Sequence, residues 1–346
     1  MLTPSPTTKG RGKPRTSNHI RKFSSPLALS GGKANIYFGD SLEFYDDWPT
    51  PTVIISDGAY GILGFNGDTP NPQHLKEWYL PHVEAWSRRA SYQTTLWLWN
   101  TELGWATLHP LLEEYGWKFV ALHVWDKGKA HIAGKNTSNL KHLPIVTEVC
   151  AQYVREPRIS GKTIKEWLLD EWKRAGLKKS TANQAAGVKN AASRKYLDQG
   201  HLWYPPPPEA FERMVRFANE YGSPEGRPYF SLDGKRPISR EEWLTLFPKF
   251  HPIQGWTNVW HRPPLKGKER VAKKKSAHLN QKPLDLTQLI IQLTSDPGDI
   301  VWEPFGGLFT GVLAAALLDR VGYGSEIDPE YYDLGAERLI SGLTRC

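Results

Sequence analysis

The chain has little cysteine and no long hydrophobic run. Only two cysteines, Cys150 and Cys346, occur among 346 residues, which argues against a disulfide framework and against a cysteine-based metal site. The longest aliphatic run, Val312 to Leu318, is far shorter than the roughly 20 apolar residues of a membrane-spanning helix. The amino terminus has no apolar signal core, so we expect a cytoplasmic protein that does not associate with a membrane.

Acidic residues are absent from residues 1–34, whereas Lys and Arg are frequent there. Much of the remainder is Pro, Ser, Thr and Gly, a composition typical of a disordered basic arm. The whole chain has a net charge of +8 and a mean hydropathy of −0.52. These values indicate a soluble protein, and the charge suggests a polyanionic partner. Many basic proteins have no such partner, so the charge alone does not decide the function.

Strand-like and helical segments alternate on both sides of a central region of different character. Expected strands lie at 34–40, 52–57, 94–100, 118–125, 145–154, 300–302 and 321–328, and expected helices at 75–90, 106–115, 284–293 and 310–320. Such alternation predicts an α/β fold with a mostly parallel sheet. We therefore expect one α/β domain built from residues 35–155 and 275–346, interrupted by an insertion at residues 156–274.

The insertion is expected to be mainly helical. An amphipathic segment spans residues 164–175, and residues 180–197 are typical of two helices joined by a turn at Gly187. This order resembles a helix-turn-helix, whose second helix presents polar side chains to a DNA groove. A plain helical hairpin fits the same pattern. The candidate DNA-binding residues on the second helix are Lys189, Asn190, Ser193, Arg194 and Lys195.

Two loops carry the residues that point to chemistry. The segment Trp302–Gly311 is a short apolar strand followed by glycines and an apolar helix, and Glu326 ends the next expected strand. A glycine turn before a helix and a carboxylate about twenty residues further on are the layout of a nucleotide-binding βαβ unit. The other loop, Asp57–Tyr60, follows a buried strand at the end where α/β sheets bind ligands.

In order and spacing, these segments resemble the DNA amino-methyltransferases, and more narrowly their circularly permuted β-class. The box at 278–283, Pro297-Gly-Asp299, the turn at 303–309 and the Gly-x-Glu strand at 324–326 match the family's order, as do Gly39-Asp40 and Asp57–Tyr60. The resemblance implies a Rossmann-like methyltransferase sheet with a target-recognition insertion. It also implies methyl transfer from S-adenosylmethionine to the exocyclic amine of adenine or cytosine in double-stranded DNA.

The family pattern also implies roles for single residues. Phe305 and Gly307 shape the methionine and ribose pocket, Glu326 accepts the ribose hydroxyls, and Asp40 lies near the adenine or its polar edge. Lys282 belongs to the box that closes the methionine end. Glu303 stands where the family has Asp, and we also assign it to the cofactor site.

The catalytic loop follows from the chemistry of the amine, whose lone pair is delocalised into the base. The Asp57 carboxylate and the Gly58 carbonyl are expected to accept the two amine hydrogens, and Tyr60 to stack on a base flipped out of the duplex. This direct transfer requires no metal. The resemblance further suggests a modification enzyme paired with a restriction endonuclease.

Three residues depart from the family pattern. Gly58 and Ala59 replace two prolines, which predicts a more flexible catalytic loop, and Phe309 replaces a glycine, where it either crowds the cofactor or packs against the helix. Asp57 favours adenine N6, because cytosine-N4 enzymes often have Ser at that position. Methylation of cytosine N4, an RNA substrate, and a DNA-binding protein that has lost catalysis remain alternatives.

Overall fold

The computed structural model describes residues 26–62, 68–69, 71–133, 139–224, 226–270 and 281–344. Most of the expected arm and the first three residues of the 278–283 box lie outside these ranges. The arm was predicted to extend to residue 34, but β1 (Leu27–Leu29) already pairs antiparallel with β2 (Ala34–Phe38). Leu27 and Leu29 pack beside the apolar cluster that contains Ala34 and Ile36, so this end of the arm belongs to the sheet.

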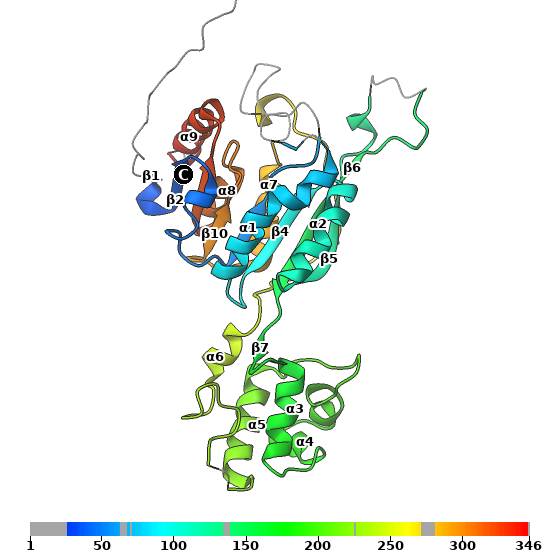
Figure 1. Cartoon of the computed structure of the whole chain (residues 1–346), viewed down its shortest axis with the longest axis vertical. Coiled ribbons are helices and arrows are strands. Elements are labelled where there is room, and N and C mark those ends of the chain that lie inside the picture. Colours follow the sequence, from blue (N-terminus) through cyan, green and yellow to red (C-terminus); the bar gives the residue numbers. More distant parts are fainter. Residues whose placement is uncertain are drawn as a thin grey trace, which may run out of the picture.

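One large sheet organises the described chain (Figure 1). Its strands lie in the order β1, β2, β11, β10, β3, β4, β6, β5, β9. Besides β1 and β2 these are β3 (Val53–Ser56), β4 (Thr95–Asn100), β5 (Trp117–Asp126), β6 (Thr147–Arg155), β9 (Val259–His261), β10 (Ile300–Glu303) and β11 (Val321–Glu326). The strands from β2 to β4 in this order run parallel, and β6 is antiparallel to both of its neighbours. The predicted α/β class with a mostly parallel sheet is confirmed.

Helices cover both faces because successive side chains of a strand point to opposite sides. On one face, α1 (Leu75–Arg89) and α2 (Glu102–Glu114) pack on Ile54 and Trp302. On the other face, α7 (Leu284–Thr294) and α8 (Thr310–Leu317) pack on Val53 and Val301. The last helix, α9 (Pro329–Leu343), lies against α8. No helix in the described ranges is both long and apolar enough to span a membrane.

Phe309 points into the core beside α8 and does not line the cavity described below. Its side chain is fully buried among Ile36, Val312 and Leu339. Its backbone has φ 52° and ψ 48°, the left-handed region that favours glycine. Glycines surround the ring: a Cβ added at Gly306, Gly324 or Gly335 would lie 2.3, 3.1 or 2.6 Å from a ring atom. The phenylalanine therefore keeps the backbone turn of a glycine and fills space left by other glycines.

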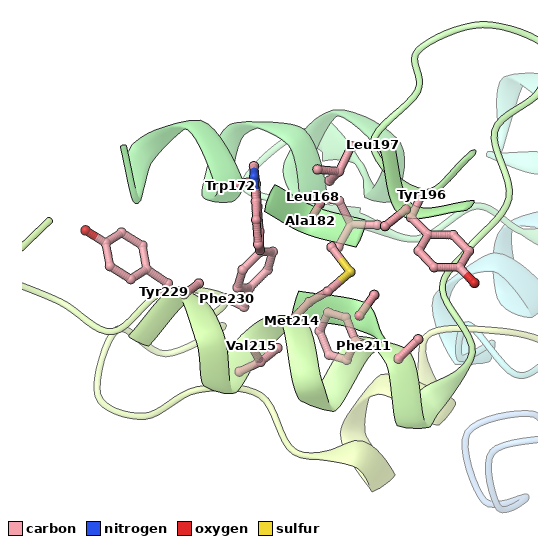
Figure 2. Packing of buried hydrophobic residues seen from close by; sticks show 14 of the residues in the cluster. Leu168, Trp172, Ala182, Tyr196, Leu197, Phe211, Met214, Val215, Tyr229 and Phe230 are labelled. Atoms are coloured by element: carbon pink, nitrogen blue, oxygen red, sulfur yellow. The ribbon is translucent and has the colours of Figure 1, made fainter. Parts of the chain in front are cut away.

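Residues 158–247 form a separate helical unit with its own core. It begins with the short hairpin of β7 (Arg158–Ile159) and β8 (Lys162–Thr163) and contains α3 (Ile164–Arg174), α4 (Thr181–Ala186), α5 (Pro208–Tyr221) and α6 (Arg240–Thr245). Figure 2 shows Leu168, Trp172, Phe211 and Met214 meeting between these helices. Two chain segments join this helical unit to the sheet (Figure 1).

The helical unit is attached at the edge where the parallel strands begin. Thr95, the first residue of β4, lies opposite Val154 near the end of β6. The exit segment contacts the sheet domain through Tyr92, whose hydroxyl donates to the Arg158 carbonyl at 3.2 Å. The return segment is held there too, because Lys249 pairs with Asp299, just before β10, at 2.6 Å.

The second helix of the expected helix-turn-helix is much shorter than predicted. Gly187 ends α4 in the left-handed conformation, as expected, but the residues after it form only a single π-helical turn, Ala192–Tyr196. Asn183 explains the difference, because its side chain accepts from the Ser193 amide at 3.0 Å and donates to the Ser193 hydroxyl at 2.8 Å. These bonds fold the segment back onto α4.

Phe309 gives a test of this packing. We expect Phe309→Ala to lower the free energy of unfolding by about 3–5 kcal/mol because a buried ring is lost. Phe309→Gly should be the more stable of the two variants by about 1 kcal/mol, since only glycine adopts this φ without strain. Urea unfolding of both variants measures the difference. A glycine variant less stable than the alanine variant would show that the left-handed turn is not retained.

Candidate active site

One cavity of about 950 Å³ lies at the carboxyl ends of β3, β10 and β11. It brings together every catalytic and cofactor position predicted from the sequence, namely Asp40, Asp57, Gly58, Tyr60, Lys282, Glu303, Phe305, Gly307 and Glu326. The parallel order of the strands explains this, because β10 pairs with β3 on one side and β11 on the other. Loops separated by some 250 residues of chain thus end at one edge of the sheet.

The glycine loop after β10 is held by Glu326 at the end of β11. One Glu326 carboxylate oxygen accepts from the Gly307 amide at 2.6 Å, and the other accepts from the Asp328 amide at 2.8 Å. Burial raises the pKa of Glu326, although these amides oppose the shift. Asp40 lines the same cavity, and one of its oxygens accepts from the Leu42 amide at 3.0 Å. Each carboxylate oxygen can accept a further hydrogen bond, so a ligand with hydroxyl groups can bind here.

Glu303 lines the cavity, but its carboxylate is directed at the start of α8. Its two oxygens accept from the Gly311 and Val312 amides at 2.7 and 2.9 Å. These amides belong to the first turn of the helix, which has no internal acceptors for them. Burial raises the pKa of Glu303 to about 7, against the opposing effect of the amides and of Arg338. Its observed contacts therefore position the loop, whereas direct contact with a cofactor remains a prediction.

Asp57 lies in a buried charged network at the end of β3. One of its oxygens, Oδ1, contacts the Lys282 ammonium at 2.8 Å and accepts from the Tyr60 hydroxyl at 2.7 Å. Among the described residues no donor contacts its other oxygen, Oδ2. Lys282, which the family pattern assigns to the methionine end, here contacts the catalytic loop. Burial lowers the pKa of Lys282, but the two carboxylates Asp57 and Glu148 outweigh it, so the pKa is raised.

Glu148 on β6 completes this network and was not identified from the sequence. Its Oε1 lies 2.9 Å from the Lys282 ammonium and 2.7 Å from the Tyr60 hydroxyl, and its Oε2 lies 2.7 Å from the Lys127 ammonium. Burial opposes ionisation, but the two ammonium groups outweigh it and lower the pKa of Glu148 to about 2. The sequence feature that could have identified Glu148 is a carboxylate inside the otherwise mostly buried strand β6.

Hydrogen bonds hold the catalytic loop where the family has prolines. The Ala59 carbonyl accepts from the Asn100 amide group at 3.0 Å and from the Tyr79 hydroxyl at 3.3 Å. Asp68 accepts from the Tyr60 amide at 2.9 Å. A Cβ at Gly58 would lie 2.7 Å from both the Tyr79 hydroxyl and the Phe305 ring. Gly58 thus permits close packing, and the greater flexibility expected from Gly58 and Ala59 stays a prediction.

Aromatic residues of α1 form a wall of the cavity that sequence reasoning missed. The rings of Trp78 and His82 lie with their centroids 5.0 and 4.9 Å from that of Phe305. Trp78 and His82 are four residues apart, so the sequence alone could have placed them on the same face of the helix. Tyr60, expected to stack on a base, is 9% exposed, and the Lys282 ammonium lies 5.2 Å from its ring centroid. Stacking on Tyr60 therefore stays a prediction.

The five predicted DNA-binding residues do not lie at the cavity. Lys189, Asn190, Ser193, Arg194 and Lys195 belong to the helical unit, at the opposite end of the parallel strands. Four of them are exposed, whereas Ser193 is half-buried and bound to Asn183. That these residues bind DNA stays a prediction. Within the described residues no group of three His, Cys, Asp or Glu side chains is placed to hold a metal.

Residues 53–337 match the model of a family described as DNA methylases. A stretch of 82 residues is 39% identical to DNA adenine methyltransferase YhdJ of Escherichia coli strain K12, covering 24% of this chain and 27% of that protein. Another match of 65 residues is 42% identical to type II methyltransferase M.BglII of Bacillus subtilis, covering 19% and 18%. These matches thus span less than a third of either relative's length.

Among solved structures, the chain resembles PvuII DNA methyltransferase, whose name states cytosine-N4 specificity. The TM-score is 0.53 at 13% identity, over 94% of this chain and 96% of that one. At this identity the similarity concerns the fold, and it confirms the predicted methyltransferase-like sheet.

The buried Glu303 predicts a pH dependence of stability. Its pKa is raised from 4.5 to about 7 in the folded protein, so unfolding releases a proton between these values and stability falls as pH rises. The loss is on the order of 3 kcal/mol and levels off above about pH 7. Glu303→Gln should remove this part of the dependence. Urea unfolding at several pH values checks it, and an identical pH profile in the variant would contradict the assignment.

Proposed function

Because the chain belongs to the DNA methylase family, which its residues 53–337 match, we propose that it transfers a methyl group from S-adenosylmethionine to an exocyclic amine of a DNA base. The observation that carries the proposal is that the Asp57 loop and the Phe305–Gly307 loop open on the same cavity. One loop can hold the amine and the other the methyl donor, although the two are far apart in sequence.

The residues present fit S-adenosylmethionine. The cavity, about 950 Å³, is at the upper end of the range for small-molecule sites, which leaves room for a base beside the cofactor. Glu326 supplies acceptors for the ribose hydroxyls, and Asp40 supplies acceptors for the polar edge of the adenine. Phe305, Trp78 and His82 supply an aromatic wall. When bound, this cofactor supplies an electrophilic methyl group on sulfur.

Asp57 is suited to orient the amine. Its Oδ2 can accept one amine hydrogen while Lys282 and Tyr60 hold Oδ1. The Gly58 carbonyl is the second acceptor, since the Ala59 carbonyl is already bound by Asn100 and Tyr79. Holding both hydrogens directs the nitrogen lone pair at the methyl carbon. The nitrogen would then take the methyl group that S-adenosylmethionine supplies, with S-adenosylhomocysteine as the leaving group, and its surplus proton would pass through Asp57 Oδ2 to water.

The departures from the family pattern do not favour an inactive DNA-binding protein. Phe309 packs in the core and leaves the cavity open, and the loop at Gly58 is held by hydrogen bonds. The order of the chain, with the catalytic loop first, the helical unit next and the cofactor loop last, supports the permuted β-class. We favour adenine N6 as the acceptor because Asp57 lines the cavity, while Ser56 is fully buried in β3. A role beside a restriction endonuclease follows from the same resemblance.

Nucleoside mass spectrometry tests this function. DNA incubated with the protein and S-adenosylmethionine should gain N6-methyladenine, and Asp57→Ala should abolish the gain while DNA affinity stays within about threefold, because Asp57 orients the amine and does not contact phosphates. If N4-methylcytosine forms instead, the methylated base is cytosine, and the proposed enzyme class still holds. The proposal would be refuted if the protein bound cofactor and varied duplexes but produced no methylated nucleoside. Methyl transfer by the Asp57→Ala variant would refute the assignment of the Asp57 loop as the catalytic loop.

A further inference from the structure

We propose that the helical unit carries a second DNA-binding surface, which contacts the phosphates of a duplex segment away from the target base. The inference rests on the proposed function only for the choice of DNA as the polyanion. It is carried by a cluster of unpaired cations on the helical unit and by the position of that unit relative to the cavity.

The cations occur in one folded segment. Between Leu177 and Leu197 the sequence has five basic residues and no acidic one. All five are exposed and none forms an ion pair with a described residue: Lys178, Lys179, Lys189, Arg194 and Lys195. Several other exposed cations of the unit are paired with carboxylates, as in Lys162–Asp170, Arg236–Glu242 and Arg240–Glu209, and those unpaired among the described residues, such as Lys173 and Lys235, lie apart from this segment in the sequence. Five exposed cations in a segment of 21 residues without a carboxylate suit an external polyanion.

The segment is built to present these side chains together. Its apolar side enters the core of the unit through Ala182, Tyr196 and Leu197 (Figure 2). The bonds between Asn183 and Ser193 then bring the 189–195 stretch against α4. With the apolar residues turned inward, the basic side chains extend into solvent. The single π turn is too short to lie along a groove as a recognition helix does, so contact with phosphates is the mode that it supports.

The distance to the cavity separates the two sites. The helical unit leaves β6 where the parallel strands begin, whereas the cavity lies where they end. The nine residues of β6 span about 30 Å, the length of about nine base pairs of duplex. A base held in the cavity and phosphates on this segment must therefore belong to well-separated parts of one DNA molecule, or to two molecules.

Two duplex lengths test the proposal with the full-length protein. A duplex of about 12 base pairs centred on the methylation site reaches only about 20 Å to either side. It can therefore bind at the cavity but cannot reach the helical unit. A duplex of about 60 base pairs can also reach the helical unit. The test variant is Lys189→Gln/Arg194→Gln/Lys195→Gln. The matched control, Lys162→Gln/Arg236→Gln/Arg240→Gln, removes the same charge from the same unit at cations that are already paired.

Fluorescence anisotropy without cofactor measures binding. We expect the test variant to bind the long duplex at least about tenfold more weakly and to reduce the salt-dependence slope by about three, one for each lost phosphate contact. The control should stay within about twofold of the unmodified protein, since its exposed pairs contribute little. Thermal unfolding should be unchanged in both. Unchanged binding by the test variant, or an equal loss in the control, would overturn the proposal.

The methyl-transfer rate on the short duplex distinguishes a remote site from target recognition. It should be the same for the test variant and the unmodified protein. An equal loss on short and long duplexes would overturn the proposal by placing these cations at the target site. Because anisotropy needs no methyl transfer, an inactive cavity would refute the proposed function without affecting this result.

Discussion

The candidate site depends on the buried ammonium of Lys282, which bridges Asp57 and Glu148. Burying a charge is costly unless partners compensate for the lost water. Here two ammonium groups, from Lys282 and Lys127, face two carboxylates, and the Tyr60 hydroxyl lies between the carboxylates. The network joins the loop after β3, the strand β6 and the segment before α7. Its contacts hold the Asp57 side chain at the edge of a largely buried site.

The order of the sheet makes this network possible. Because β10 lies between β3 and β11, the last part of the chain completes a sheet begun by the first part. Glu303 and Glu326 then fix the glycine loop from its two neighbouring strands. The helical unit disturbs none of these contacts, since it leaves from the opposite end of the strands. Residues for methyl transfer and residues for remote DNA contact can thus occupy separate ends of one molecule.

Local patterns predicted the parts of the structure that depend on local chemistry. The buried strands, the glycine loop and the acidic end of β11 follow from hydrophobic runs and from turn residues, and the family resemblance then named the single positions around the cavity. Glu148 could not, because its importance arises from the pairing of β6 with β4 and β5, a contact between distant segments. The placement of the helical unit likewise depends on the direction of β6, which the hydrophobic pattern does not encode.

Side-chain packing explains the remaining differences. At Phe309 the backbone has the left-handed conformation that favours glycine, and the ring fills space beside Gly306 and Gly335. No rule of spacing reveals such a compensation. The shortened helix after Gly187 similarly results from one side chain, Asn183, that competes for the backbone of Ser193. Neither feature could be predicted without knowing which residues contact each other in the folded chain.

The most direct test of this account is the single-turnover methyl-transfer rate of Glu148→Gln, measured with its affinity for S-adenosylmethionine. Glu148 does not line the cavity but holds Lys282 and Tyr60 against Asp57. We predict a fall in rate of about a hundredfold, as expected when a reacting group is displaced by about 1 Å. Cofactor affinity should stay within about threefold, because the residues assigned to the cofactor are unchanged. An unaltered rate in a folded variant would contradict the claim that this network positions Asp57.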